Sequence, residues 1–228
     1  MAAAKLSNPL ALAVLTLLAE RPMHPYEMST TLRERHKEDS IKLNYGSLYS
    51  IVAVLQKHGL IAVQETVREG NRPERTIYAI TEAGKQKMVG WLSDLISVPG
   101  KEFTQFEAAL SLMGALAPNE VLRLLELRLL SLRMQRSSAD GVLASLPANF
   151  PRIFLIEGEF QTALVDTEIR FVEGLIADLR SESLGGFAFW RRLHELRATD
   201  LSPDEIDAVL AKEFHDELSW MEEMKGQG

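Results

Sequence analysis

A run of hydroxyl-bearing and small side chains lies in the stretch LNYGSLYSIVAVLQKHGLI, between Leu43 and Ile61. The apolar residues of this stretch recur at helical spacing, which predicts a helix from Tyr45 with one buried face. The opposite face carries glycine, serine and alanine, and such small side chains allow a helix backbone to approach the base edges in the major groove of B-DNA. The neighbouring tyrosine and serine hydroxyls can bond to phosphates or bases. The pattern therefore indicates recognition of double-stranded DNA.

Three arginines follow within eight residues of one another, in a segment that favours a β-hairpin. The stretches LIAVQETV and RTIYAI alternate apolar and polar residues, and REGNRPE between them is rich in turn-forming residues. An arginine on such a hairpin can enter a minor groove or pair with phosphate. The expected DNA-binding residues, taken from the helix, its flanks and the hairpin, are Lys42, Asn44, Tyr45, Gly46, Ser47, Tyr49, Ser50, Lys57, Arg68, Arg72 and Arg75.

Two other interpretations of the same residues stay open. The hairpin arginines alternate with Glu65, Glu69 and Glu74, so cross-strand ion pairs on a solvated hairpin would also explain them. Domains with this order of elements also serve as protein-interaction modules that do not bind DNA. Binding to promoter DNA across a salt series distinguishes the two functions, because phosphate contacts give a steep salt dependence.

The flanking segments predict the elements that position the helix and the hairpin. Helices are expected from Pro9 to Glu20 and from Pro25 to Arg35, and another from Glu82 to about residue 96, after the Thr81 cap. The order is helix, helix, helix, hairpin, helix, which predicts a winged helix-turn-helix domain at residues 1–98. The whole chain is expected to be mainly α with a small β-hairpin.

Several motifs in this region resemble the PadR family of bacterial transcriptional regulators. They are Gly46-Ser47-Leu48-Tyr49 with Leu55, Gly59-Leu60-Ile61, the segment from Tyr78 to Gly84, and MHPYEM, where Pro25 replaces the family's usual glycine. The chain departs from the family at Ser50, which is commonly proline there, and at Tyr45, which is often small or proline. Because both positions lie on the expected DNA face, the resemblance does not carry over the family's usual target sequence.

The resemblance implies a dimeric transcription factor, usually a repressor and often relieved by a small molecule. The expected partners are double-stranded DNA with an inverted-repeat operator, a second copy of the chain, and a small aromatic or drug-like effector. Trp91 has two interpretations. One is plain core packing, which we favour because aromatic residues at helical spacing usually pack in a core, and the other is an effector-stacking site.

Residues 99–228 are expected to form an all-α dimerisation domain. Helices are expected at residues 103–116, 118–136 and 153–183, with a loop at 137–152, and a last helix begins at Pro203 and runs toward Met224. Leucines lie on more than one face of the helix that begins at Pro118, so this helix needs partners on both sides. A second subunit is the economical source of such a partner, and a compact monomeric bundle is the alternative. The expected dimer-interface residues are Leu125, Leu129, Leu132, Ile156, Phe160, Leu164, Phe171 and Leu175.

Composition and charge limit the other functions. The chain has no cysteine, which excludes disulfides, cysteine-ligated zinc and thiol catalysis and fits a cytoplasmic protein. Its net charge of −7 divides unevenly: residues 1–96 carry 12 Lys and Arg against 10 Asp and Glu, and the remainder is acidic. The apolar run from Leu6 to Ala19 is too short to span a membrane.

No phosphate-binding glycine loop, nucleophile motif or metal-ligand cluster is present, and His215 is expected on a solvated acidic face. We therefore expect no catalytic residue, metal or cofactor.

Overall fold

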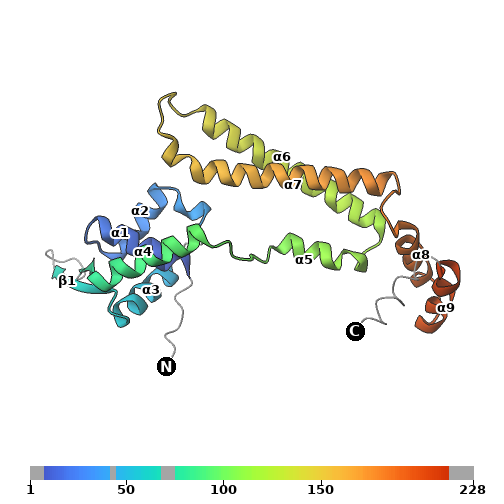
Figure 1. Ribbon diagram of the computed structural model, residues 1–228, viewed down its shortest axis with the longest axis horizontal. Helices are drawn as coiled ribbons and strands as arrows, with labels where there is room; N and C mark the ends of the chain where they lie inside the picture. The colour runs from blue at the N-terminus through green and yellow to red at the C-terminus, as the bar shows by residue number, and fades with distance from the viewer. Residues whose placement is uncertain (1–7, 42–44, 68–74, 216–228) are drawn as a thin grey trace. The chain divides into compact units, whose positions relative to one another are not determined.

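The computed structural model describes residues 8–41, 45–67 and 75–215, which fall into two compact units (Figure 1). The N-terminal unit spans Met1–Glu102 and the C-terminal unit spans Phe103–Gly228. The described chain is mostly helical and contains a two-stranded antiparallel hairpin, so the expected fold class is confirmed. In its described residues, no helix is long and apolar enough to cross a membrane.

The N-terminal unit has the element order of a winged helix-turn-helix domain. A 3-10 turn at Lys37–Asp39 lies between the second and third helices. The remaining elements are α1 (Pro9–Glu20), α2 (Pro25–Glu34), α3 (Tyr45–Lys57), β1 (Ile61–Val67), β2 (Arg75–Ile80) and α4 (Glu82–Ser97).

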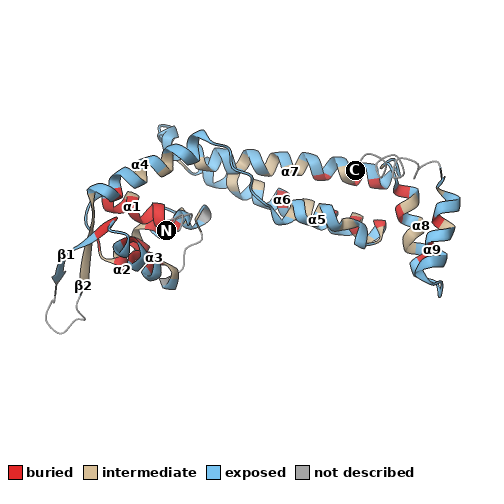
Figure 2. Cartoon of the chain, turned by 60° about the horizontal axis from the view of Figure 1, so that its bottom comes forward, coloured by how far each residue is buried: buried red, intermediate tan, exposed pale blue. Residues whose placement is uncertain are grey.

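Helix α1 forms the centre of the N-terminal unit. It begins at Pro9 because the side chain of Asn8 accepts a hydrogen bond from Leu10 N at 3.0 Å, and proline suits the first helical position. Its sequence, PLALAVLTLLAE, is apolar on every side, and most of its residues are buried (Figure 2). Helices α2, α3 and α4 and strand β2 all pack against it. A helix without a polar face is stable only with this surrounding cover.

The hairpin is tied to the helices at its base. Strands β1 and β2 pair antiparallel, from Ile61 opposite Ile80 to Val67 opposite Arg75, with an irregularity between Val63 and Glu65. Met23, in the turn between α1 and α2, exchanges two backbone hydrogen bonds with Tyr78 on β2, both of 3.0 Å. The strand is therefore held on both edges near its end, and the hairpin has a fixed origin in the unit.

A junction of four residues, Gly59, Leu60, Thr81 and Gly84, joins α3, the hairpin and α4. Helix α3 ends at Lys57, and Gly59, two residues later, has a left-handed φ of +68°, as expected for a glycine just after a helix. The Thr81 hydroxyl donates to Gly59 O at 2.7 Å and accepts from Gly84 N at 3.1 Å. Thr81 N donates to Leu60 O at 3.0 Å. One threonine therefore closes the end of α3 and caps the start of α4.

The C-terminal unit is built on a long helical hairpin. Helices α6 and α7 pack along each other, and ion pairs join them, including Arg133 to Glu173 and Arg136 to Asp166, both at 2.7 Å. The short helices α8 and α9 pack together beyond the end of α7 (Figure 1). The elements are α5 (Gln105–Leu112), a 3-10 turn (Met113–Ala115), α6 (Pro118–Ala144), a 3-10 turn (Arg152–Phe154), α7 (Ile156–Arg180), α8 (Phe187–Arg197) and α9 (Pro203–Glu213).

Two expectations about these helices were wrong. A loop was expected from residue 137, but α6 continues to Ala144, because a single Gly141 does not end a helix and Arg136 pairs with Asp140 one turn later. Helix α8 was not expected at all. It begins after Gly186, whose φ is +79°, and its Phe187 and Trp190 are buried against the α6–α7 core. The Ser202 capping box at the start of α9 is confirmed.

The junction predicts that substitutions of two glycines in α4 differ in their effect on the free energy of unfolding. A Cβ at Gly84 would lie 2.0 Å from Leu60 O, a backbone atom, whereas a Cβ at Gly90 would meet nothing within 4 Å. We expect Gly84→Ala to lower the free energy of unfolding by at least about 2 kcal/mol. Gly90→Ala should leave it unchanged or raise it by up to about 1 kcal/mol, because alanine favours a helix interior. Urea denaturation measures both, and equal effects would contradict this account of the junction.

Candidate nucleic-acid interface

The outer face of α3 is exposed and carries small side chains. Leu48, Ile51, Val52 and Leu55 are buried in the core of the N-terminal unit, so the helix is held by one face only. Gly46, Ser50, Ala53 and Lys57 lie on the exposed face. The division between buried and exposed residues is the one that the sequence predicts. With no large side chain at these small positions, the backbone of α3 can approach a base-pair edge closely.

The three predicted hydroxyl groups are not equivalent. Tyr49 is 49% exposed, so its ring stands out from the helix. Ser50 Oγ donates to Gly46 O at 2.9 Å within the helix, so its proton is already used and the oxygen is left to accept. Ser47 is only partly exposed. Tyr49 is therefore the hydroxyl on this face that is best placed to donate outward.

Gln56 is an exposed residue of the same face that the sequence analysis missed. It lies on α3 two turns after Tyr49 and one turn after Ala53. Its amide both donates and accepts, the combination that pairs with the N6 and N7 edge of adenine. The signal was present in the sequence, because residues 49, 53 and 56 follow helical spacing. The sequence prediction included its charged neighbour Lys57 and omitted Gln56.

The predicted flanking and hairpin residues are only partly described. Tyr45 is the first residue of α3, and Arg75 is exposed at the start of β2. Lys42 and Asn44, before α3, and Arg68 and Arg72, in the hairpin turn, lie outside the described residues. Five further predicted residues lie within the described part of α3: Gly46, Ser47, Tyr49, Ser50 and Lys57.

The cations around α3 differ in whether the protein itself neutralises them. Arg21 pairs with Glu27 at 2.5 Å and Arg35 with Glu20 at 2.6 Å. Within the residues that the structure describes, Lys57 and Arg75 form no ion pair. These two cations are therefore available for phosphate, and their pairing with an anion would not first require breaking an internal salt bridge.

His24 caps helix α2 and responds to a neighbouring arginine. Its Nδ1 accepts a hydrogen bond from Tyr26 N at 3.1 Å, which requires an unprotonated nitrogen. Partial burial lowers the pKa of His24 below its ordinary value of 6.5, and the positive charge of Arg75 on β2 lowers it further, while Glu27 acts in the opposite direction. The neutral ring and the hairpin arginine are therefore linked electrostatically.

Trp91 is half-buried on α4, where it packs against the core of the N-terminal unit beside other partly buried residues such as Met88. This position provides an apolar contact for one side of the ring. It is compatible with the interpretation of Trp91 as a core residue, which we favoured on the sequence.

The predicted dimer residues fall into two groups within the C-terminal unit. One group contributes to the unit's own core, where Leu125 and Leu132 are buried and Leu129 and Leu175 are partly buried. Packing between α6 and α7 of one chain accounts for their burial. The other group stands exposed along α7 by half or more of each side chain, and consists of Ile156, Phe160, Leu164 and Phe171.

Comparison with known proteins identifies the N-terminal region. Residues 14–89 match the model of a family described as transcriptional regulator PadR-like, which confirms the resemblance. Among the residues that the structure describes, no three potential metal ligands come together. No curated protein matches the chain.

Solved structures share the fold. The chain is similar to Bacillus subtilis PadR in complex with operator DNA, with 20% sequence identity and a TM-score of 0.57 over 75% of this chain and 97% of that one. It is also similar to the Vibrio cholerae virulence activator AphA, with 17% identity and a TM-score of 0.57 over 76% and 99%. Bacillus subtilis PadR in complex with p-coumaric acid matches with 17% identity and a TM-score of 0.56 over 78% and 99%.

The pKa of His24 predicts how acid affects the N-terminal unit. Because its pKa is lowered in the folded protein, the unfolded chain takes up the proton first, so this contribution to stability is present above about pH 6.5 and is lost as the pH falls through the lowered pKa. His24→Asn keeps a capping side chain and removes the titration. We expect the free energy of unfolding to fall less steeply below pH 6.5 in the variant. Equal pH slopes in urea denaturation would contradict the prediction.

Proposed function

Because the chain carries a PadR-like transcriptional-regulator domain at residues 14–89, we propose that this DNA-binding regulator acts as a homodimeric repressor on an inverted-repeat operator. The observation that carries the proposal is the exposed small-sided face of α3, in a winged helix held rigid by its own core. In this proposal Tyr49 and Gln56 contact bases, while Lys57 and the hairpin arginines Arg68, Arg72 and Arg75 contact phosphate.

Dimerisation follows from the small size of one DNA-binding surface. A single winged helix with few available cations makes few phosphate contacts and binds weakly. Two copies on a two-fold axis reach successive major grooves about 34 Å apart, and their linkage raises the affinity of both. We assign residues 1–98 to DNA binding and residues 99–228 to dimerisation.

The apolar face of α7 supports this assignment. Ile156, Phe160, Leu164 and Phe171 recur at intervals of one or two turns, and each leaves half or more of its side chain exposed in one chain. Helix α6 adds further exposed residues, including Leu127 and Leu130. Contiguous apolar surface on this scale marks an interaction site, and a second copy of the same hairpin matches it in length and character.

Regulation by a small molecule is part of the proposal. The Bacillus subtilis PadR structure with p-coumaric acid supports an aromatic effector, and Trp91 offers a ring against which a planar molecule could stack. Repression is proposed from the family resemblance, and AphA, a virulence activator of the same fold, represents the opposite sign of regulation. Such a protein acts on chromosomal DNA in the cytoplasm.

The proposal is tested with DNA from the protein's own promoter region. Fluorescence anisotropy of labelled fragments across a salt series should give specific binding with a steep salt dependence, and footprinting should show two half-sites. Binding that is independent of both sequence and salt would favour a protein-interaction module instead. A reporter gene on the footprinted promoter then distinguishes repression from activation.

A substitution on α3 separates base contacts from phosphate contacts. Tyr49→Phe removes one exposed hydroxyl and leaves the helix and its charge unchanged. We expect affinity for the footprinted operator to fall about tenfold, the value of one hydrogen bond with a charged or well-aligned partner. Affinity for unrelated DNA of the same length should fall less, and that DNA serves as the control. Equal losses on both would assign Tyr49 to phosphate, and no loss would remove it from the interface.

A charge on α7 tests the dimer. Phe160 is 62% exposed, so Phe160→Glu does not disturb the core of one chain, whereas burial of its carboxylate between two chains would be costly. We expect sedimentation to show a monomer and operator affinity to fall by about a hundredfold or more, because avidity is lost. Gln161→Glu places the same charge on an adjacent exposed position and should remain dimeric. A dimeric Phe160→Glu variant would move the interface away from this face.

A further inference from the structure

The two ends of α3 are held in different ways. Its C-terminal end leads into the junction, where the Thr81 hydroxyl bonds to the backbone at Gly59. Its N-terminal end, which carries Gly46 and Tyr49, follows a connection that leaves α2 at Arg35. The direction of the exposed face in the first half of α3 therefore depends on how the end of α2 is held.

A two-point ion pair joins the end of α2 to the end of α1. Arg35 Nη1 donates to Glu20 Oε1 at 2.6 Å, and Arg35 Nη2 donates to Glu20 Oε2 at 2.7 Å. Glu20 is the last residue of α1, and Arg35 is the C-cap of α2. In such a pair the guanidinium and the carboxylate face each other, so the contact fixes direction as well as distance. We call this pair the Glu20–Arg35 fork.

The fork is charged at neutral pH and open to solvent. The hydrogen bond from Arg35 lowers the pKa of Glu20, and the hydrogen bond to Glu20 raises the pKa of Arg35. Both side chains are 47% exposed, and exposed ion pairs add little to the free energy of unfolding. The main effect of the fork is therefore on geometry rather than on stability.

The fork lies where burial no longer holds α2. Leu32 is the last buried residue of the helix, and the two residues after it, Arg33 and Glu34, are exposed. The start of α2, by contrast, is held by the His24 cap and by the backbone bonds of Met23 to β2. The fork therefore holds the end of the helix that burial constrains least.

The turn after α2 has a strained backbone. His36 has a φ of +52°, in the left-handed region, which costs energy for a residue other than glycine. Such a conformation persists where the structure on both sides imposes it. Arg35 in the fork lies on one side. On the other side, Ile41 N donates to Lys37 O at 2.9 Å, and Ile41 packs against the core of the unit.

We propose that Glu20 and Arg35 are positioning residues for DNA recognition. The fork sets the direction of α2 relative to α1 and, through the turn at His36, the direction of the first half of α3. Neither residue contacts DNA. The role in recognition rests on the proposed function, whereas the hold of the fork on the turn can be measured in the free protein.

Glu20→Gln in the full-length protein separates a positioning role from a direct phosphate contact. The substitution breaks the fork, frees Arg35 and makes the chain less negative by one charge, so a phosphate contact by Arg35 would strengthen. We expect the opposite for the footprinted operator, whose affinity should fall about tenfold, the value of one misplaced base contact. Affinity for unrelated DNA of the same length should stay equal or rise. Arg35→Lys keeps the charge, loses the two-point geometry and should cause the same loss.

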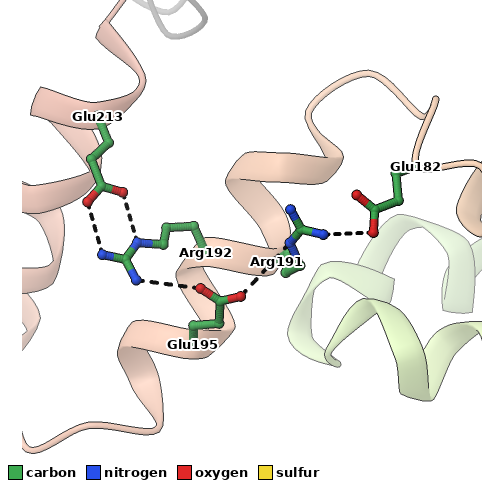
Figure 3. A network of polar contacts seen from close by, with 5 residues as sticks. All are labelled: Glu182, Arg191, Arg192, Glu195 and Glu213. Carbon is green, nitrogen blue, oxygen red and sulfur yellow. Dashed lines mark hydrogen bonds and ion pairs between the residues drawn. The ribbon is translucent and has the colours of Figure 1, made fainter.

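The chain offers a matched control in its C-terminal unit. Arg192 and Glu213 form another two-point pair, with Nε to Oε2 at 2.8 Å and Nη2 to Oε1 at 2.9 Å (Figure 3). Glu213→Gln breaks a pair of the same kind with the same change of charge. Glu27→Gln makes that change within the N-terminal unit, where it breaks the single contact with Arg21. Neither control should lower operator affinity, and thermal melting checks that each variant is folded.

Hydrogen exchange of the free protein, followed by NMR, tests the fork without DNA. His36 N donates to Arg33 O at 2.8 Å, and Ile41 N donates to Lys37 O, so both amides report on the turn. They should exchange at least about fivefold faster in Glu20→Gln and Arg35→Lys than in the wild type, because the turn opens more often. The two control variants should exchange like the wild type.

Wild-type exchange in both fork variants, or operator affinity that is unchanged or raised by Glu20→Gln, would overturn the positioning role. A wild-type protein that does not distinguish its promoter DNA from unrelated DNA would instead reject the proposed function. Specific binding by the wild type together with unaltered fork variants would reject the fork alone.

Discussion

The geometry of the N-terminal unit depends on the contact between the Thr81 hydroxyl and the backbone at Gly59. This single group ends α3, starts α4 and stands at the base of the hairpin. Gly84 lets α4 approach Leu60 O so closely that any side chain at this position would collide. Backbone atoms therefore help to fix the direction in which α3 presents its exposed face. The side chains on that face do not pack in the core of the unit.

Because these side chains are not needed for packing, the exposed face of α3 can consist of small and mostly uncharged residues. Small residues permit close approach to a base edge but provide little binding energy themselves. In the proposed complex, the binding energy comes from phosphate contacts outside α3 and from a second copy of the unit. In the proposed function these two features are connected, because the N-terminal unit binds DNA through the small residues of α3 and the exposed apolar residues of α7 join two copies of the chain.

Local signals made much of this fold predictable. Asn8, Pro9, Gly59 and Thr81 mark helix ends by their own chemistry, so the N-terminal elements agree with the sequence prediction. Helix α8 was not predicted, because it is stabilised by the burial of Phe187 and Trp190 against helices distant in the sequence. The periodicity of apolar residues does not reveal such contacts. The same limit applies to α6 and α7, where apolar spacing could not separate Leu125, which packs within the chain, from residues that stand exposed. On α3, helical periodicity predicted which face is exposed. The hydrogen bond of Ser50 within the helix depends on its side-chain rotamer, which the sequence does not give.

The distribution of charge along the chain supports the proposed assignment of DNA binding to the N-terminal unit. Residues 97–228 carry 13 Lys and Arg against 22 Asp and Glu, so this part of the chain repels phosphate. Many of its arginines are moreover engaged with its own carboxylates, across the α6–α7 hairpin and around α8. An arginine engaged in this way offers little to a polyanion. The internal pairing therefore adds to the acidic charge of this part of the chain in disfavouring contact with phosphate, which supports the proposed assignment of DNA binding to the N-terminal unit.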